Sequence, residues 1–132
     1  MTKEKRFKKE YGIELLRIAE GDLHSAKVLE KDSIGRRENI LFHAEQCIEK
    51  CLKAVLCHLE MPLPLVPNLD VILDRFLNGP KVPRAADMGD LSQFAAIRRY
   101  EEGKSNLEPE EIQAVLQMAE ETLQWAKKII QV

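Results

Sequence analysis

The amino-acid sequence predicts an all-α protein, an up-and-down bundle of four to five helices that forms a single domain over residues 1–132. Three observations support this. Apolar residues recur at steps of three and four along most of the chain, which is the period of amphipathic helices. The composition of 45% hydrophobic and 32% charged residues suits helices with one buried and one charged face. A length of 132 residues fits one hydrophobic core and leaves little room for two.

The first two predicted helices are the longest apolar-periodic segments. The first runs from about residue 8 to residue 31, and its stripe consists of Leu15, Leu16, Ala19, Leu23, Ala26 and Leu29. The preceding residues 1–8 are expected to be a flexible basic start, since residues 1–10 hold five basic and two acidic side chains. The second helix is predicted over about residues 36–60 as the centre of the bundle, and the proline-rich residues 61–67 as an extended connector.

Shorter helices follow, and capping signals define their ends. Asn68 is expected to cap a third helix that stops at Asn78-Gly79-Pro80. Asp87 is expected to cap a fourth, which ends near residues 99–103. Pro109 marks the first turn of the last helix, and Leu107 is placed to pack onto Ile112. No segment reads as a strand.

Charge and cysteine usage restrict the classes of partner and compartment. The net charge of −2 gives no global basic field, so any nucleic-acid contact must be local, and binding to DNA is not expected. No segment resembles a secretory signal, and none approaches the roughly 18 apolar residues of a membrane span. Three cysteines make a poor disulfide framework and favour a reducing compartment, so a cytoplasmic protein without membrane association is expected.

No cofactor or metal is expected. His43, Cys47 and Cys51 lie on successive turns of one predicted helix, and zinc accepts imidazole and thiolate ligands. However, these three residues spread over about 12 Å of helix, which is too far for one ion. Buried cysteines that act as small hydrophobic residues are the preferred interpretation.

One side of the second helix combines charged residues with a ring and a thiol. Its members are Phe42, Gln46, Glu49, Lys50, Lys53 and Cys57, opposite the apolar Ala44, Ile48, Cys51 and Val55. A solvated face with a Glu49 to Lys53 pair is the simplest interpretation. Phe42 and Cys57 argue instead for partial burial against another surface.

The segment ENILFHAEQCIEKCLKAVL resembles the second-helix signature of the HEPN family, with matches at Phe42, His43, Gln46, Glu49, Lys50, Lys53 and Ala54. Upstream, LLRIAEGDLHSAKVLE resembles the first helix of that family at Ala19, Asp22, Leu23 and Ala26. Downstream, FAAIRRYEEG resembles its Arg-Tyr element at Arg99 and Tyr100. The resemblance implies a helical bundle that usually dimerises, is often encoded beside a small nucleotidyltransferase, and includes both RNA-cleaving and non-cleaving members.

The chain departs from the ribonuclease branch, which carries an Arg, four to six residues, and then a His near its later helices. Its last histidine is His58, so the later helices cannot supply that pair. Arg36 and Arg37 stand at a comparable spacing before His43, but in a continuous helix they would lie about 10 Å away along the axis. The chain is therefore expected to have no catalytic residues.

The leading hypothesis is a non-catalytic HEPN protein, a binding partner associated with nucleotide or RNA and paired with a nucleotidyltransferase in a toxin–antitoxin-like or similar two-protein system. An RNA endonuclease acting as a toxin and a purely structural interaction bundle are the alternatives. The expected nucleotide or RNA contacts are Arg98, Arg99, Tyr100, Lys50 and Lys53, since arginine and lysine bind phosphate and tyrosine stacks on bases. Arg98 and Arg99 have a plainer interpretation as cations that complement a helix dipole.

A homodimer is expected, with its interface on the second helix. Phe42, Gln46, Glu49, Lys50, Lys53 and Cys57 would face their own copies across a two-fold axis. Glu49 of one subunit would then meet Lys50 or Lys53 of the other around the Phe42 ring.

Overall fold

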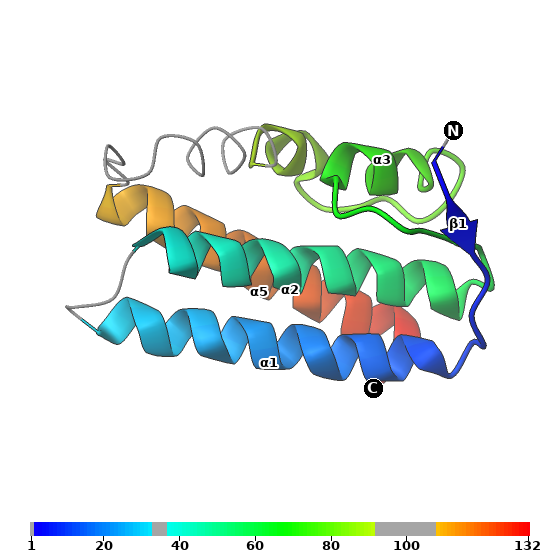
Figure 1. Ribbon diagram of the computed structural model, residues 1–132, viewed down its shortest axis with the longest axis horizontal. Coiled ribbons are helices and arrows are strands. Elements are labelled where there is room, and N and C mark those ends of the chain that lie inside the picture. The colour runs from blue at the N-terminus through cyan, green and yellow to red at the C-terminus, as the bar shows by residue number, and fades with distance from the viewer. Residues whose placement is uncertain (1, 33–36, 92–107) are drawn as a thin grey trace.

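The computed structural model describes residues 2–32, 37–91 and 108–132, and three long helices dominate that part of the chain. They are α1 (Tyr11–Lys31), α2 (Arg37–His58) and α5 (Pro109–Ile130). In Figure 1, α1 and α2 run in opposite directions side by side, and α5 lies behind them with the direction of α2. The all-α bundle predicted from apolar periodicity is confirmed.

Helix α2 is the centre of the bundle, as its uninterrupted apolar pattern predicts. It packs most extensively against α1 and next against α5. Its apolar positions Ala44, Ile48, Cys51 and Val55 are completely buried. The predicted α1 stripe is also buried, except that Leu29 at its end is only partly so. Burial of matching stripes on both helices removes apolar surface from water, which is the main force that holds them together.

The start of α1 approaches α2 unusually closely. A side chain at Gly12 would place its Cβ atom 2.9 Å from the backbone oxygen of Ala54, so the glycine permits this contact between the two helices. Gly21, in the middle of the same helix, has open space around it and no comparable role.

The shorter elements lie along one side of α2 and α5 (Figure 1). Helix α3 (Leu69–Asp74) is shorter than expected, because turns replace the helix before Asn78. Asn68 occupies its N-cap position, but the side chain makes no capping hydrogen bond. Residues 85–91 are helical, so Asp87 lies inside this helix and the prediction that it is the N-cap is wrong. Its carboxylate instead accepts a hydrogen bond from Arg84 at 3.2 Å.

Helix α5 has strong local signals at both ends. Pro109 stands in its first turn, and Glu108 and Glu111 form a reciprocal capping box, which the sequence analysis did not identify. Lys127 and Lys128 lie in the last turn, where the helix dipole favours cations. Leu107 lies outside the described residues, so its predicted contact with Ile112 stays a prediction.

A small sheet corrects the expectation that the chain has no strand. Strand β1 (Glu4–Lys5) pairs antiparallel with β2 (Leu63–Pro64) in the connector after α2. The residues expected to be a flexible start thus contact the connector, at the end of the molecule where α1 begins and α2 ends (Figure 1). None of the described helices combines the length and apolar character needed to cross a membrane.

Candidate functional site

The polar residues predicted on one side of α2 form a hydrogen-bonded cluster around a buried carboxylate. Glu49 is only 5% exposed. Its carboxylate accepts hydrogen bonds from Lys53 at 3.1 Å and from Lys50 at 3.4 Å. Gln46 lies one turn earlier, where its side-chain oxygen accepts a hydrogen bond from Lys50 at 3.0 Å and its amide group donates to Glu49 at 3.5 Å. Four of the six predicted interface residues therefore contact one another.

This cluster carries an excess of positive charge. Two ammonium groups share one carboxylate, and the Lys50 and Lys53 side chains are only 22% and 13% exposed. A largely buried lysine interacts with anions more strongly than a fully solvated one, because water screens the charge less. The interpretation of this side of α2 as a plain solvated face does not fit a buried carboxylate.

The two apolar members of the predicted interface differ from each other. Phe42 is 44% exposed and its ring contacts the ring of His43 edge-on, with centroids 5.4 Å apart. Cys57 is buried, and its Sγ donates a hydrogen bond to the carbonyl oxygen of Lys8 at 3.0 Å. The segment before α1 covers Cys57, which accounts for its burial within one chain, so its part in a homodimer interface stays a prediction. We call Phe42, Gln46, Glu49, Lys50 and Lys53 the α2 stripe.

Burial of Cys57 raises the pKa of its thiol, although the backbone amide of Gly12 acts in the opposite direction. Cys47 and Cys51 are buried in the core, and a hydrogen bond with Cys47 and burial raise the pKa of Cys51 well above its usual range. A neutral buried thiol is a poor nucleophile and a poor metal ligand. No group of three metal-ligating side chains occurs in the part of the chain that the structure describes.

His43 and Arg37, which have the spacing of a ribonuclease pair, are not brought together. The ring of His43 lies beside Asp22 of α1, with Nδ1 to Oδ1 at 3.5 Å. Arg37 is exposed in the first turn of α2. It lines a cavity of about 360 Å³ near the C-terminal end of α1, together with Glu30 and Pro109. Since α2 is continuous from Arg37 through His43, the two residues are separated by about 9 Å of helix. Arg36 lies outside the described residues.

Arg98, Arg99 and Tyr100 also lie outside the described residues, so their contact with nucleotide or RNA stays a prediction. Two features of the described residues were missed by sequence reasoning. One is the Asp22–His43 pair, although both residues belong to the family resemblance. The other is the burial of Glu45, one turn before Glu49. A sequence window does not show which long side chain on a helix is covered by another element.

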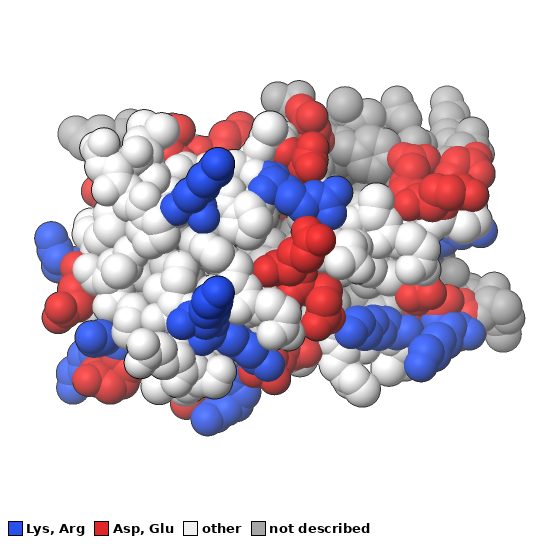
Figure 2. Space-filling model, turned by 180° about the vertical axis from the view of Figure 1, so that it is seen from behind, with Lys and Arg blue, Asp and Glu red and all other residues white. Residues whose placement is uncertain are grey.

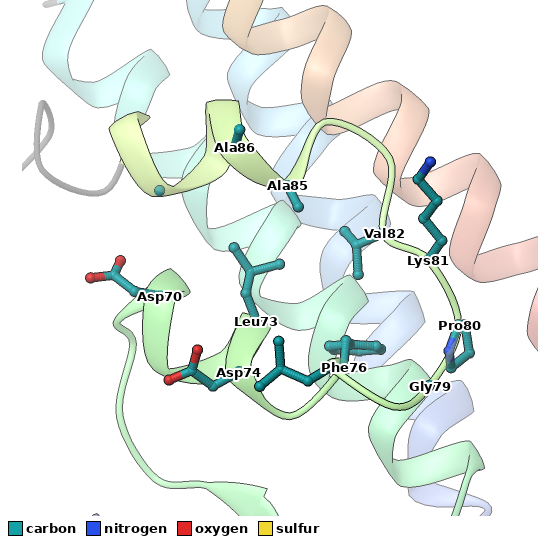
Figure 3. A pocket seen from close by; sticks show the side chains of 12 residues that line it. Asp70, Leu73, Asp74, Phe76, Gly79, Pro80, Lys81, Val82, Ala85 and Ala86 are labelled. Carbon is teal, nitrogen blue, oxygen red and sulfur yellow. The ribbon is translucent and has the colours of Figure 1, made fainter.

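A cavity of about 600 Å³ lies between α3 and the segment that follows it. Figure 3 shows Leu73 and Val82 facing its centre, whereas the carboxylates of Asp70 and Asp74 and the ammonium group of Lys81 point away from it. Small-molecule sites combine an apolar lining with polar groups that converge on the ligand. This cavity has an apolar lining, but its polar groups do not converge on a common point. The α2 stripe is therefore the better candidate for the functional site.

The face seen in Figure 2, opposite to that of Figure 1, shows acidic and basic side chains scattered among each other, with a largely uncharged area at one end. This distribution agrees with the net charge of −2. It also agrees with the expectation that any contact with a polyanion is local.

A family model for the HEPN domain matches residues 13–130, nearly the whole chain. No curated protein and no solved structure gave a match. The matched span contains the whole α2 stripe and reaches the last residue of α5, so it includes α2, α5 and nearly all of α1. The chain belongs to the HEPN domain family.

Proposed function

We propose that this HEPN-domain protein is a non-catalytic binding partner that contacts the phosphates of a nucleotide or RNA through the α2 stripe. The observation that carries the proposal is the sharing of the buried Glu49 carboxylate between Lys50 and Lys53, which leaves one positive charge in excess. Because Glu49 and Gln46 position both ammonium groups, a phosphate would meet donors that are already oriented. Arg98, Arg99 and Tyr100 are proposed to add further contacts.

The distribution of histidine supports a role without catalysis. The three histidines of the chain are His24, His43 and His58, so the later helices contain none. The continuous α2 helix also separates Arg37 from His43. A pair acting in acid–base cleavage must reach the same reacting group within hydrogen-bond distance, which this separation does not favour within one chain.

Binding of a fluorescent RNA oligonucleotide and of ATP to the purified protein tests the proposal. We expect the double variant Lys50→Ala/Lys53→Ala to lose affinity and to show a weaker dependence on salt. Lys27→Ala/Lys127→Ala is the matched control, since these lysines are also ion-paired, with Glu120 and Glu20. Equal affinities for the wild type and the α2 double variant would remove the α2 stripe from the site, and Arg98→Ala/Arg99→Ala tests the remaining contacts in the same assay.

The proposed protein partner is a nucleotidyltransferase, in a toxin–antitoxin-like or similar two-protein system. Affinity purification from the native host, followed by mass spectrometry, is expected to identify that enzyme among the copurifying proteins. Repeated isolation of the chain alone would count against the partnership. A bundle with a purely structural role would show no change of melting temperature with nucleotide or RNA, whereas a ligand that binds the folded state raises it.

RNA cleavage is the second candidate function, and one observation favours it. The partly exposed His43 has its Nδ1 atom 3.5 Å from a carboxylate oxygen of Asp22, and such a carboxylate can orient an imidazole for proton transfer. Incubation with total RNA decides between the two functions. Cleavage by the wild type that is lost in His43→Ala would establish the nuclease and overturn the non-catalytic proposal.

We also propose a homodimer whose interface includes the α2 stripe, with a cleft between the two copies that collects the lysines of both chains for phosphate. Phe42 is a 44% exposed ring beside charged residues, and an isologous contact would bury it against its own copy. Phe42→Asp is expected to yield a folded monomer in sedimentation, because it places an unpaired charge in the interface. Leu77→Asp is the control, since Leu77 is 80% exposed and lies outside the stripe. A monomeric wild type, or a Phe42→Asp variant that remains dimeric, would contradict this interface.

A further inference from the structure

The segment before α1 is basic, and specific contacts fix its position. Residues 2–10 hold five basic and two acidic side chains. Strand β1 pairs with β2, Arg6 donates a hydrogen bond to the carbonyl oxygen of Glu60 at 2.9 Å, and Cys57 donates to that of Lys8 at 3.0 Å. Because Gly12 has no Cβ atom, the first turn of α1 packs closely against α2 at Ala54. These basic side chains therefore project from an anchored backbone.

Two lysines of this segment, Lys8 and Lys9, are free of the ion pairs that hold the described part of the fold together. Lys8 and Lys9 are exposed and form no ion pair with any residue in the described ranges, whereas Glu4 is paired with Arg75 at 3.2 Å. Both lysines directly precede the N-terminus of α1, where the helix dipole disfavours positive charge. Two unpaired cations at the positive end of a helix indicate a surface that meets negative charge from another molecule.

Two aromatic residues flank Lys8 and Lys9 in the sequence, and their rings stack on each other. The rings of Phe7 and Tyr11 are stacked with centroids 4.9 Å apart, and the ammonium group of Lys5 lies 5.1 Å from the Phe7 centroid. Phe7 is partly buried against the core, but Tyr11 is 37% exposed. Aromatic rings set among lysines are the arrangement with which proteins bind single-stranded nucleic acids, since bases stack on the rings and phosphates contact the cations.

The backbone of this segment lies against the end of α2, close to the α2 stripe. The hydrogen bond from Cys57 to Lys8 brings the segment onto the last turns of α2, and Lys53 lies one turn before Cys57. Lysines from two distant parts of the sequence are thus attached to neighbouring backbone segments.

We propose that Lys5, Phe7, Lys8, Lys9 and Tyr11, which we call the N-terminal patch, bind single-stranded RNA. Lys8 and Lys9 contact consecutive phosphates, and a base stacks on the exposed ring of Tyr11. This assignment rests on the proposed function, because the α2 stripe holds the adjoining phosphates. It adds a substrate class, a flexible single strand whose bases are free to stack, to a site otherwise defined by charge alone.

The experiment measures the affinity of the purified full chain for a labelled oligouridylate, for the same RNA annealed into a duplex, and for inorganic polyphosphate. Lys8→Glu/Lys9→Glu is expected to weaken single-strand binding about tenfold or more and to reduce the slope of log K against log salt by about 1.4, or about 0.7 for each lost phosphate contact. Both substitutions place acidic groups before a helix N-terminus, which the dipole favours, so folding is preserved. Lys31→Glu/Lys81→Glu reverses two exposed lysines elsewhere and is expected to change the affinity little.

Substitutions at Tyr11 distinguish base stacking from simple attraction between charges. Tyr11→Leu is expected to weaken binding of the single strand by about tenfold, with Tyr11→Phe close to the wild type and polyphosphate binding unchanged in both. If Tyr11→Leu binds RNA normally, or if duplex and polyphosphate bind as well as the single strand, the patch is only an electrostatic surface and the proposal fails.

The two proposals fail in different ways. RNA binding that is lost in Lys50→Ala/Lys53→Ala but retained in Lys8→Glu/Lys9→Glu would overturn the N-terminal patch and leave the proposed function standing. A wild type that binds neither RNA nor nucleotide would overturn both.

Discussion

The α2 stripe and the N-terminal patch both contain more lysines than carboxylates, but their lysines differ in burial and in ion pairing. In the α2 stripe, Lys50 and Lys53 are largely buried and share the Glu49 carboxylate. In the N-terminal patch, Lys8 and Lys9 are exposed and pair with no described residue. Lysines that are paired near a buried carboxylate contribute to the fold as well as to any ligand contact, whereas unpaired lysines contribute only to the ligand. Substitutions in the two regions should therefore separate stability from binding.

The largest effect on stability is expected from Glu49→Gln. The substitution keeps the shape of the side chain but leaves two largely buried ammonium groups without a counter-charge. Breaking a buried ion pair in this way is strongly destabilising, and because the lysines can extend towards water we expect a loss of about 2 kcal/mol. Urea unfolding measures it. Glu14→Gln is the control, because the exposed Arg17–Glu14 pair should contribute less than about 1 kcal/mol; similar losses in the two variants would mean that burial does not distinguish the pairs.

The anchoring of the N-terminal patch on α2 is tested by two glycines of α1. Gly12→Ala is expected to destabilise by about 1 kcal/mol, because its Cβ would lie 2.9 Å from the Ala54 oxygen and the helices must separate slightly. Gly21→Ala is expected to stabilise by about 0.5–1 kcal/mol, because alanine favours the helix and meets no atom within 4 Å. Opposite signs for the same substitution on one helix are the expected outcome, and two stabilising changes would show that the contact at Gly12 is loose.

A smaller effect is expected on the pH dependence of stability, because the segment before α1 covers the thiol of Cys57. Because burial raises the pKa of Cys57, the folded state favours the neutral thiol. The stability that it contributes is complete below the unfolded pKa of about 8.5 and is lost as pH rises through the folded pKa. Cys57→Ala should therefore lose less stability than the wild type between neutral pH and alkaline pH, as measured by urea unfolding under reducing conditions. Parallel curves for the two proteins would show that the thiol is not held neutral by the fold.

The smallest effect is expected from an ion pair that joins two helices at the surface. Lys27 of α1 donates a hydrogen bond to Glu120 of α5 at 2.8 Å, and this contact lowers the pKa of Glu120. Since the folded pKa is depressed, the contribution is present above the unfolded pKa of about 4.3 and is lost as pH falls through the folded value. Lys27→Gln should remove about 0.5 kcal/mol near neutral pH and nothing in strong acid or high salt. A loss that persists in acid would mean that Lys27 acts through its packing and not through its charge.

Local patterns in the sequence determined the helices. Steps of three and four between apolar residues identified α1, α2 and α5, and the uninterrupted pattern of α2 predicted its central place. Pro109 and the lysines of the last turn marked the two ends of α5. These signals are reliable because helix periodicity and capping depend on residues within about one turn of each other. The family resemblance likewise rested on spacing within single helices, and the family is confirmed over residues 13–130.

The tertiary structure decided which side chains are covered, and by what. Glu49 and Cys57 lie on the same side of α2 as the exposed Phe42, yet Glu49 is buried in a cluster of lysines and Cys57 under the backbone of Lys8. The pairing of Glu4 and Lys5 with the connector likewise joins segments nearly 60 residues apart in the sequence. A helical period gives the direction of a side chain but not the element that lies in that direction, since this depends on how distant segments pack. For that reason the lysines of the α2 stripe were predicted from the sequence, whereas the N-terminal patch beside them emerged only from the fold.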